Sequence, residues 1–365
     1  SRQQLSAYLG CDPKDIVFTS GGTEADNWAL GGVLEANQRK GRHLIVSQIE
    51  HHAVFNVAKH LARRGLAEVS FVEVDAQGRV NPERVAELIR DDTVLVSIMA
   101  ANNEVGTIQP IAEIGRICRE RGVIFHCDAV QAGGKLRIDV DELGVDLLSL
   151  SAHKFYGPKG IGLLYVRPRT KIVPLIRGGH HERGRRAGTE NVASIVGMGR
   201  AIELAGSDLD QENARLAAMR DRFEAQLKQK IGYLVFNGHP QLRLSNTSNV
   251  TFAFVEGEAM LLHLDMRGIA ISTGSACTSE TLGASHVLAA MGLPPEFANG
   301  AVRFSLGRHN TDEQLDATVE ALVEIVGRLR EMSPLWDKLQ KGTYDPAEFD
   351  KLSCYFCSDE GEDAD

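Results

Sequence analysis

The chain has 365 residues, of which 43% are hydrophobic, enough for a large core and two domains. Its net charge of −9 and its scattered basic residues argue against a nucleic-acid partner, and no apolar run approaches the roughly 20 residues that span a bilayer. No signal peptide opens the sequence, and six cysteines in so long a chain do not form a disulfide scaffold, so we expect a protein of the reducing cytoplasm.

The first half of the sequence alternates strand and helix patterns. Residues 1–5 read as the middle of an amphipathic helix without a start signal, so we expect that a natural N-terminal segment is missing. Short apolar strands between helices are typical of a mostly parallel sheet covered on both faces, which binds ligands beyond the carboxyl ends of its strands. The predicted strands are 15–19, 43–47, 68–72, 93–99, 123–128, 146–151 and 160–166, and the predicted helices are 23–40, 53–64, 82–90 and 111–121.

The pattern changes near residues 207–211. We predict a long helix over 211–230, then a smaller α+β region with strands near 249–255, 269–272 and 300–306. A capping box of Thr311 and Gln314 opens a final helix that ends near residue 331. The predicted domains are a large α/β domain (1–208), a small α+β domain (209–335) and a C-terminal extension (336–365) with an acidic tail that we expect to be disordered.

Two of the predicted strands lead to a charged side chain. The run 146–151 leads to Lys154, and the run 123–127 leads to Asp128. These are the two groups that a protein supplies to pyridoxal phosphate (PLP), because the amine forms a Schiff base and the carboxylate keeps the pyridine nitrogen protonated. Taken alone, either residue is equally well an ordinary strand-end charge or half of a structural ion pair.

A glycine-rich turn follows the first predicted strand. In the turn 19–23, which contains Gly22 and Thr23, paired glycines let the backbone approach a phosphate, and the positive end of the next helix stabilises the anion. Ser151 and His153, beside the lysine, can add hydroxyl and imidazole contacts to the same phosphate. Many strand-to-helix turns carry such glycines, so this motif alone is a weak signal.

Three further polar side chains follow strands at the same predicted edge. His51 could lie flat on a cofactor ring and shuttle protons, although a surface histidine at a helix start is as good a reading. Asn103, within the segment 102–106, could contact a cofactor oxygen or a substrate carboxylate, and Gln131 could reach the phenolic oxygen of the ring.

The predicted small domain adds a cysteine and an arginine. Cys277 lies in a run of small polar residues, where an exposed thiol can be reactive or a product of tolerated drift. Cys118 and Cys127, by contrast, lie in apolar surroundings and are predicted to be inert core thiols. Arg303 is a charge amid apolar strand residues, where an arginine meets a carboxylate of the protein or of a substrate.

Taken together, these segments resemble the NifS/IscS-like cysteine desulfurases of the class V aminotransferase family. The resemblance covers about residues 1–335 in the expected order, and its Ser-Ala-Cys loop is similar to that of the group I branch. It implies the fold type I of PLP-dependent transferases, which is aspartate aminotransferase-like. The matching motifs are 19–24, 50–51, 102–106, 126–131, 153–160, 178–189 and 275–277.

The resemblance implies a role for each matching residue. Lys154 would hold PLP, Asp128 would pair with the pyridine nitrogen, and His51 would stack on the ring. The other implied contacts are Gly22, Thr23, Ser151 and His153 to the phosphate, Asn103 and Gln131 to cofactor oxygens, Asn103 and Arg303 to the substrate carboxylate, and Thr189 to the phosphate in the neighbouring subunit. The contact of Thr189 implies a homodimer with shared sites.

The implied reaction removes sulfur from L-cysteine. Lys154 would act as the base at the α-carbon, and the Cys277 thiolate would take the sulfur as a persulfide, leaving L-alanine. A loop of small residues suits delivery of that sulfur. The acceptor would be a protein such as an iron–sulfur scaffold or a tRNA-thiolation enzyme.

The sequence departs from the family at both ends. It lacks the N-terminal Asn-Ala-Ala-Thr-Thr motif and the C-terminal residues thought to dock a scaffold partner, which puts activity in doubt. It carries instead Cys354 and Cys357, which could bind a metal with outside ligands, relay persulfide sulfur or be incidental; no other metal site is predicted. The alternatives are another class V PLP enzyme, such as an aminotransferase or a selenocysteine lyase, and an inactive dimeric sulfur-transfer scaffold.

Overall fold

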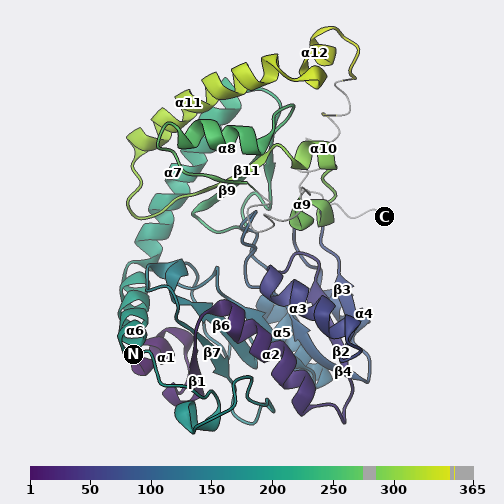
Figure 1. The fold of residues 1–365 in the computed structure, drawn as a ribbon, viewed down its shortest axis with the longest axis vertical. Coiled ribbons are helices and arrows are strands. Elements are labelled where there is room, and N and C mark those ends of the chain that lie inside the picture. Colours follow the sequence, from purple (N-terminus) through teal and green to yellow (C-terminus); the bar gives the residue numbers. More distant parts are fainter. Residues whose placement is uncertain (274–284, 346–348, 350–365) are drawn as a thin grey trace. The chain divides into compact units, whose positions relative to one another are not determined.

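The computed structural model describes residues 1–273, 285–345 and 349, which belong to two compact units (Figure 1). The first unit comprises Ser1–Val74, Arg79–Asn103 and Ile108–Asp210. The second comprises Asp75–Gly78, Glu104–Thr107 and the chain from Gln211 onward, so it includes two short segments from the first half of the sequence. Within the described ranges, no helix combines the length and the apolar character needed to cross a membrane.

A seven-stranded mixed sheet forms the centre of the first unit. Its strands are β1 (Ile16–Thr19), β2 (His43–Ser47), β3 (Glu68–Val72), β4 (Thr93–Ser97), β5 (Ile124–Asp128), β6 (Leu147–Ser151) and β7 (Gly162–Val166). They lie in the order β1-β7-β6-β5-β4-β2-β3, and only β7 runs antiparallel to its neighbours, β1 and β6. Most of these strands are buried along their whole length, which explains their near-continuous apolar runs.

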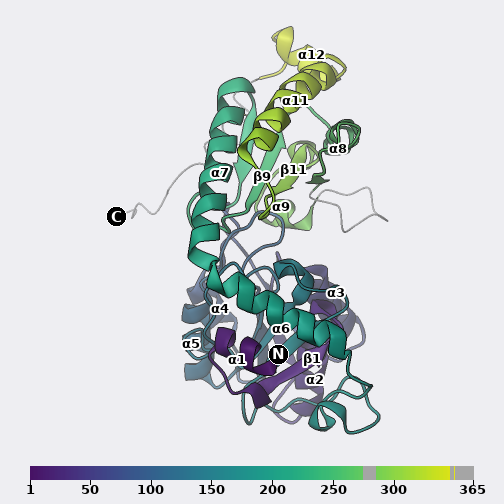
Figure 2. The ribbon, with the colours of Figure 1, turned by 90° about the vertical axis from the view of Figure 1, so that its left-hand side faces the viewer.

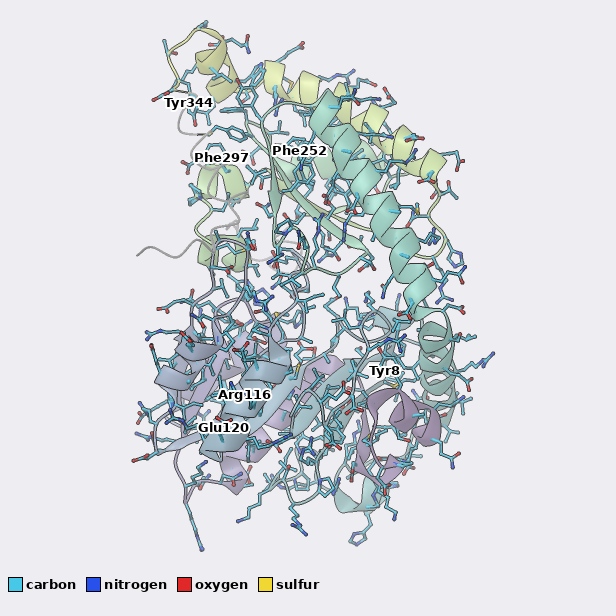
Figure 3. All side chains as sticks on the ribbon, turned by 180° about the vertical axis from the view of Figure 1, so that it is seen from behind. Tyr8, Arg116, Glu120, Phe252, Phe297 and Tyr344 are labelled. Atoms are coloured by element: carbon cyan, nitrogen blue, oxygen red, sulfur yellow. The ribbon has the colours of Figure 1, made fainter. Side chains whose placement is uncertain are left out.

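Helices cover both faces of this sheet. They are α1 (Arg2–Leu9), α2 (Gly22–Ala36), α3 (His52–Arg63), α4 (Pro82–Leu88), α5 (Ile111–Arg121) and α6 (Val192–Ser207), with 3-10 turns η1 (Pro13–Asp15), η2 (Ala152–Phe155) and η3 (His181–Gly184). Successive residues of one strand enter different cores: Leu44 of β2 packs in the core of α2 and α3, and Ile45 packs in the core of α1, α5 and α6. Helices α1 and α6 lie side by side (Figure 2). The outer face of α5 carries the ion pair of Arg116 and Glu120 (Figure 3).

A four-stranded antiparallel sheet forms the second unit together with its helices. The elements are α7 (Leu209–Lys230), β8 (Leu234–Asn237), β9 (Thr247–Phe252), α8 (Gly257–Asp265), β10 (Ser272–Thr273), α9 (His286–Ala290), α10 (Pro295–Ala298), β11 (Ala301–Ser305), α11 (Asp312–Glu331) and α12 (Pro334–Gln340). The strand order is β10-β11-β9-β8. Phe252 of β9 lies in the core shared with α7, α8 and α11, whereas Phe297 and Tyr344 flank the ring of Phe254 in a separate aromatic group (Figure 3).

The prediction of a mostly parallel sheet flanked by helices is confirmed. The capping box is also confirmed: Thr311 Oγ1 accepts the Gln314 N–H at 3.4 Å, and Gln314 Oε1 accepts the Thr311 N–H at 3.2 Å. The strand predicted over 269–272 consists only of Ser272–Thr273. The structure also contains the helices α6, α8, α9, α10 and α12 and the strand β8, which the sequence patterns did not predict.

Candidate active site

One edge of the seven-stranded sheet collects the segments that were predicted to bind a cofactor. The parallel strands β4, β5 and β6 end there, and β1 ends there too, because β1 and β6 both run antiparallel to β7. The register fixes this arrangement, since Thr19 and Ser151 are both paired with Gly162. A Cβ on Gly162 would lie 2.7 Å from backbone atoms of Gly21, so the close approach of the two segments requires glycine.

Gly22, the first residue of α2, joins two further segments of this edge. A Cβ on Gly22 would lie 2.6 Å from Cγ2 of Val130 and 3.6 Å from Cβ of Ser151. Thr23 follows and is exposed. The first N–H groups of a helix have no partner within the helix, and the helix dipole adds positive charge at this end. The structure therefore brings Gly22, Thr23 and Ser151 together at a turn that favours an anion such as phosphate.

Asp128 ends β5 at the same edge and is 4% exposed. Burial raises the pKa of its carboxyl to about 6, although the N–H of Val130, which donates to Oδ1 at 2.9 Å, and the charge of Lys154 lower it. At neutral pH the carboxylate is therefore ionised but only weakly compensated. A protonated pyridine nitrogen would supply the missing positive charge.

Lys154 lies on η2, the single 3-10 turn that follows β6. Its side chain is half-buried, and its effect on the pKa of Asp128 shows that the amine lies within electrostatic reach of that carboxylate. Its neighbour His153 is exposed. Partial burial of the ring, and then the charge of Lys154, lower the pKa of His153. The expected amine–carboxylate pair is thus present at one site.

A buried polar cluster surrounds His126, two residues before Asp128. His126 Nδ1 lies 2.8 Å from Ser97 Oγ, and Nε2 lies 3.0 Å from Ser149 Oγ and 3.6 Å from Asp26 Oδ1. Burial lowers the pKa of His126 to about 3, so the ring is neutral. Burial, and then repulsion from Asp128, raises the pKa of Asp26 well above its usual value. Burial and the nearby charge of Asp128 therefore both oppose ionisation of Asp26.

Glu50 is a third buried carboxyl group near Asp128. Its Oε1 accepts from Ser47 Oγ at 2.5 Å and from the Met99 N–H at 2.9 Å. The pKa of Glu50 is raised to about 8. Burial and the charge of Asp128 raise it, and the two hydrogen bonds lower it. The next residue, His51, caps α3, because its Nδ1 accepts the N–H of Ala53 at 3.1 Å. The hydrogen on a neutral His51 ring is then at Nε2.

The remaining predicted residues of the first unit are spread around the same edge. Asn102, before the half-buried Asn103, donates from Nδ2 to the carbonyl of Ile49 at 3.0 Å and so ties the end of β4 to the segment of His51. Gln131 is half-buried in the turn that follows Asp128. Thr189 is exposed and lines a pocket of about 220 Å³ with Thr19, Ser20 and Arg186 of the same chain.

Arg303 belongs to the second unit. On β11 it is paired with Asn249 of β9 and with Ser272 of β10. Burial raises the pKa of the nearby Glu104 to about 7. The hydrogen bond that Glu104 Oε2 accepts from Ser285 Oγ at 2.5 Å and the charge of Arg303 both lower this pKa. Cys277, Cys354 and Cys357 lie outside the described residues.

Two cysteine predictions fall on described residues and are confirmed. Cys118 and Cys127 are 1% and 0% exposed. Burial raises the pKa of Cys118 to about 12 and that of Cys127 well above its usual value. A thiol that stays protonated is neither a nucleophile nor a metal ligand, so both are core residues.

Three residues of the site escaped the sequence analysis: Asp26, the carboxyl group of Glu50, and Lys135. Asp26 had a signal, since it lies one helical turn after Gly22 and so shares its face of α2. Glu50 had none beyond its place before His51. Lys135 reaches the site only through the fold, because its Nζ donates to the carbonyl of Lys154, nineteen residues away.

These residues fit pyridoxal phosphate: a helix start with glycine for an anion, a buried carboxylate for a pyridinium nitrogen, and a lysine amine for an aldehyde. A mostly parallel sheet that holds this set at the carboxyl ends of its strands defines a PLP-dependent transferase of fold type I.

Comparisons with known proteins agree. Residues 1–318 match the family "Aminotransferase class-V". The chain is 53% identical over 338 residues to the cysteine desulfurase IscS of Methanosarcina thermophila, covering 93% of this chain and 83% of that protein. Among solved structures it is similar to a NifS-like protein (TM-score 0.84, 40% identity, 90% and 87% of the two chains) and to SspA in complex with cysteine (TM-score 0.73, 38% identity, 85% and 86%).

The chain belongs to the class V aminotransferase family, in its branch of NifS/IscS-type cysteine desulfurases. The predicted resemblance, fold type and PLP cofactor are thereby confirmed.

Proposed function

We propose that the protein transfers the sulfur of L-cysteine to Cys277, with release of L-alanine. The observation that carries this proposal is the convergence of Gly22, Asp128, Ser151 and Lys154 at one edge of the sheet. The relatives named cysteine desulfurase, and the solved relative in complex with cysteine, support this substrate. In such a reaction the bound PLP acts as an electron sink for the substrate α-carbon.

Each residue of the edge then has a defined task. Lys154 would hold the cofactor through its amine, and Asp128 would pair with the pyridine nitrogen. His51 would stack on the ring. The other proposed contacts are Gly22, Thr23, Ser151 and His153 to the phosphate, Asn103 and Gln131 to cofactor oxygens, and Arg303 and Asn103 to the substrate carboxylate.

The protein's own groups perform the proton and sulfur transfers. Lys154, once its amine is displaced by that of the substrate, takes the proton from the α-carbon. The Cys277 thiolate then forms a bond to the substrate sulfur while the carbon–sulfur bond breaks, so that the electron pair of that bond stays with carbon. A proton added to that carbon and a proton returned to the α-carbon by Lys154 complete L-alanine, and Cys277 keeps the sulfur as a persulfide.

The proposal extends to assembly and partners. Thr189 lies on the exposed side of its own chain, which supports a homodimer in which it reaches the phosphate of the neighbouring subunit. The persulfide would pass to an acceptor protein, such as an iron–sulfur scaffold or a tRNA-thiolation enzyme. Cys277 must be a reduced thiol to act as the nucleophile, so the proposed location is the reducing cytoplasm.

Two experiments test the proposal. Borohydride reduction of PLP-loaded protein, followed by peptide mapping, should leave a pyridoxyl adduct on Lys154. With L-cysteine as substrate, Cys277→Ala should abolish alanine release and leave the adduct, whereas Cys11→Ala, which removes a half-buried thiol with a pKa raised to about 12, should leave both unchanged.

The alternatives give different results. Loss of alanine release in Cys277→Ala separates the proposal from an aminotransferase, which has no need of Cys277, and a strong preference for selenocysteine would point to a selenocysteine lyase. Saturating PLP that leaves no adduct on Lys154 would refute the proposal and favour an inactive scaffold. Sulfur found by mass spectrometry only on Cys354 or Cys357 after one turnover would overturn the role of Cys277.

A further inference from the structure

The turn that follows Asp128 packs directly on η2, the 3-10 turn that carries Lys154. A Cβ on Gly133 would lie 3.0 Å from Leu150 and 3.1 Å from the ring of Phe155. A Cβ on Gly134, which has a φ of +69°, would lie 2.7 Å from the Cβ of Phe155. The two glycines therefore let the backbone of this turn come into contact with the residue next to Lys154.

A tyrosine of α1 holds the same turn from its other side. The hydroxyl of Tyr8 (Figure 3) donates to the carbonyl of Leu136 at 2.6 Å and accepts the N–H of Gly134 at 2.9 Å. Burial raises the pKa of Tyr8 to about 12, so the hydroxyl keeps its proton and can make both bonds. The turn 131–136 is thus fixed with respect to α1 as well as to η2.

Lys135 links this turn to η2 through its side chain. Its Nζ donates to the carbonyl of Gln131 at 3.1 Å and to the carbonyl of Lys154, nineteen residues away, at 3.2 Å. Burial, followed by repulsion from the charge of Lys154, lowers the pKa of Lys135 to about 8. One ammonium group therefore joins the main chains of Gln131 and Lys154, both of which are proposed to contact the cofactor.

We propose that Lys135 is a positioning residue. It fixes the distance between the backbone of Lys154 and the turn 129–131, so that the amine of Lys154 can reach the aldehyde carbonyl of the bound cofactor. A single 3-10 turn has poor hydrogen-bond geometry and does not hold its own orientation, so it needs such a contact. The charges of Lys135 and Lys154 repel each other, so Lys135 disfavours charge on Lys154, whereas the carboxylate of Asp128 favours it. An uncharged amine is the form that attacks an aldehyde.

The inference rests on the proposed function, because it assumes that Lys154 binds PLP. The test measures the rate at which the PLP-free protein captures added PLP, from the visible absorbance, with the adduct mapped to Lys154 after borohydride reduction. Lys135→Met removes the ammonium and keeps an unbranched side chain that is one atom shorter, and Lys135→Arg keeps a charged donor. The matched control is Lys40→Met, because Lys40 also donates to a backbone carbonyl, that of Gly122 at 2.7 Å.

We expect Lys135→Met to capture PLP at least about tenfold more slowly than wild type, since a displacement of about 1 Å at a reacting group costs up to about a hundredfold. Lys135→Arg should restore most of the rate, and Lys40→Met should match wild type. The pH midpoint of the visible absorbance of the bound cofactor should rise in Lys135→Met and be unchanged in Lys40→Met, which a merely structural role of Lys135 would not produce.

The outcomes separate this inference from the proposed function. A wild-type protein that captures no PLP at Lys154 overturns the proposed function. A Lys135→Met protein that is folded and captures PLP at the wild-type rate overturns the positioning role alone. If Lys135→Met does not fold, Lys135→Gln, which keeps one donor, is measured instead; a wild-type rate and absorbance midpoint in that variant overturn the role, and a slowed rate with a raised midpoint supports it.

Discussion

Two groups of buried carboxyl groups, one in each unit, are compensated in different ways. In the second unit, the carboxylate of Glu224 is 9% exposed and accepts both guanidinium N–H groups of Arg243, at 2.8 and 2.7 Å, and the hydroxyl of Ser248 at 2.7 Å. In the first unit, Asp26, Glu50 and Asp128 lie close enough to repel one another, and burial raises the pKa of each.

The difference shows how a structural charge can be told from a functional one. A buried carboxylate that a guanidinium matches at two points is compensated by its own chain and holds the fold together. A cluster of carboxyl groups with raised pKa values is compensated only when a cationic group arrives. The carboxyl groups at the edge of the first sheet therefore indicate a binding site, whereas the Glu224–Arg243 pair indicates a structural role.

The largest effect is expected when the charge that pairs with the cofactor is removed. Asp128→Ala should weaken PLP binding and lower alanine release from cysteine by about a thousandfold, because the pyridine nitrogen loses the carboxylate that keeps it protonated. Alanine release and PLP retained after gel filtration measure the two effects. Asp128→Asn, which keeps the shape of the side chain, should be nearly as inactive; near-normal turnover of Asp128→Ala would contradict the assignment.

Breaking the compensated pair of the second unit should cost stability. Arg243→Met leaves Glu224 buried without its cation and should lower the free energy of unfolding by about 3–5 kcal/mol, measured by urea denaturation. Adding Glu224→Leu should recover most of this loss, because no charge then remains buried. The control is Arg42→Met at the exposed pair with Glu68, for which we expect less than about 1 kcal/mol. Equal losses in the two single variants would undo the contrast between buried and exposed pairs.

The stability of the PLP-free protein should fall as the pH rises. The pKa of Glu50 is about 8 in the folded chain and 4.5 in its usual range, so the folded state binds this proton more tightly between those values. Its contribution is complete below pH 4.5 and is lost up to about pH 8, with a slope of at most about 1.4 kcal/mol per pH unit. Melting temperatures at several pH values measure it.

Glu50→Gln should flatten that pH dependence. Glu104→Gln in the second unit provides the comparison. The pKa of Glu104 is raised only to about 7, so the pH range over which its contribution to stability is lost is narrower. A Glu50→Gln protein with the pH dependence of the wild type would show that this carboxyl is ionised in the folded state.

The smallest effect concerns the packing of the turn on η2. Gly134→Ala would place a methyl group 2.7 Å from Phe155 at a positive φ, and we expect a loss of about 1–3 kcal/mol in thermal or urea unfolding. The matched control is Gly122→Ala, at a φ of +63° with open space around it, which isolates the cost of the backbone conformation. If both variants lose the same stability, close packing around Lys154 is not required.

Local patterns account for the elements that the sequence predicted well. The helix start at Thr311 and the strand that leads to Asp128 depend on neighbours within a few residues, and both lie where the patterns placed them. The direction of β7 did not follow from its apolar run, because a strand buried on both faces reads alike in either direction. The short β8, whose residues are alternately buried and half-buried, gave too little pattern to be predicted.

The candidate site divides in the same way. Lys154, Asp128 and the turn at Gly22 were found from the sequence, because a strand that ends in a particular side chain is a local feature. The links between them were not, since Gly22 meets Val130, and Lys135 meets the carbonyl of Lys154, only across the fold.

The sequence by itself determined which chemical groups this protein brings to a reaction: an amine, a carboxylate, a phosphate-binding turn and a thiol. Only the tertiary structure decided that burial raises the pKa values of Asp26, Glu50 and Asp128, and that Lys135 donates to the backbone carbonyl of Lys154. The physical reason is that desolvation and Coulomb energies depend on distances between atoms, and the fold sets those distances between residues far apart in the chain.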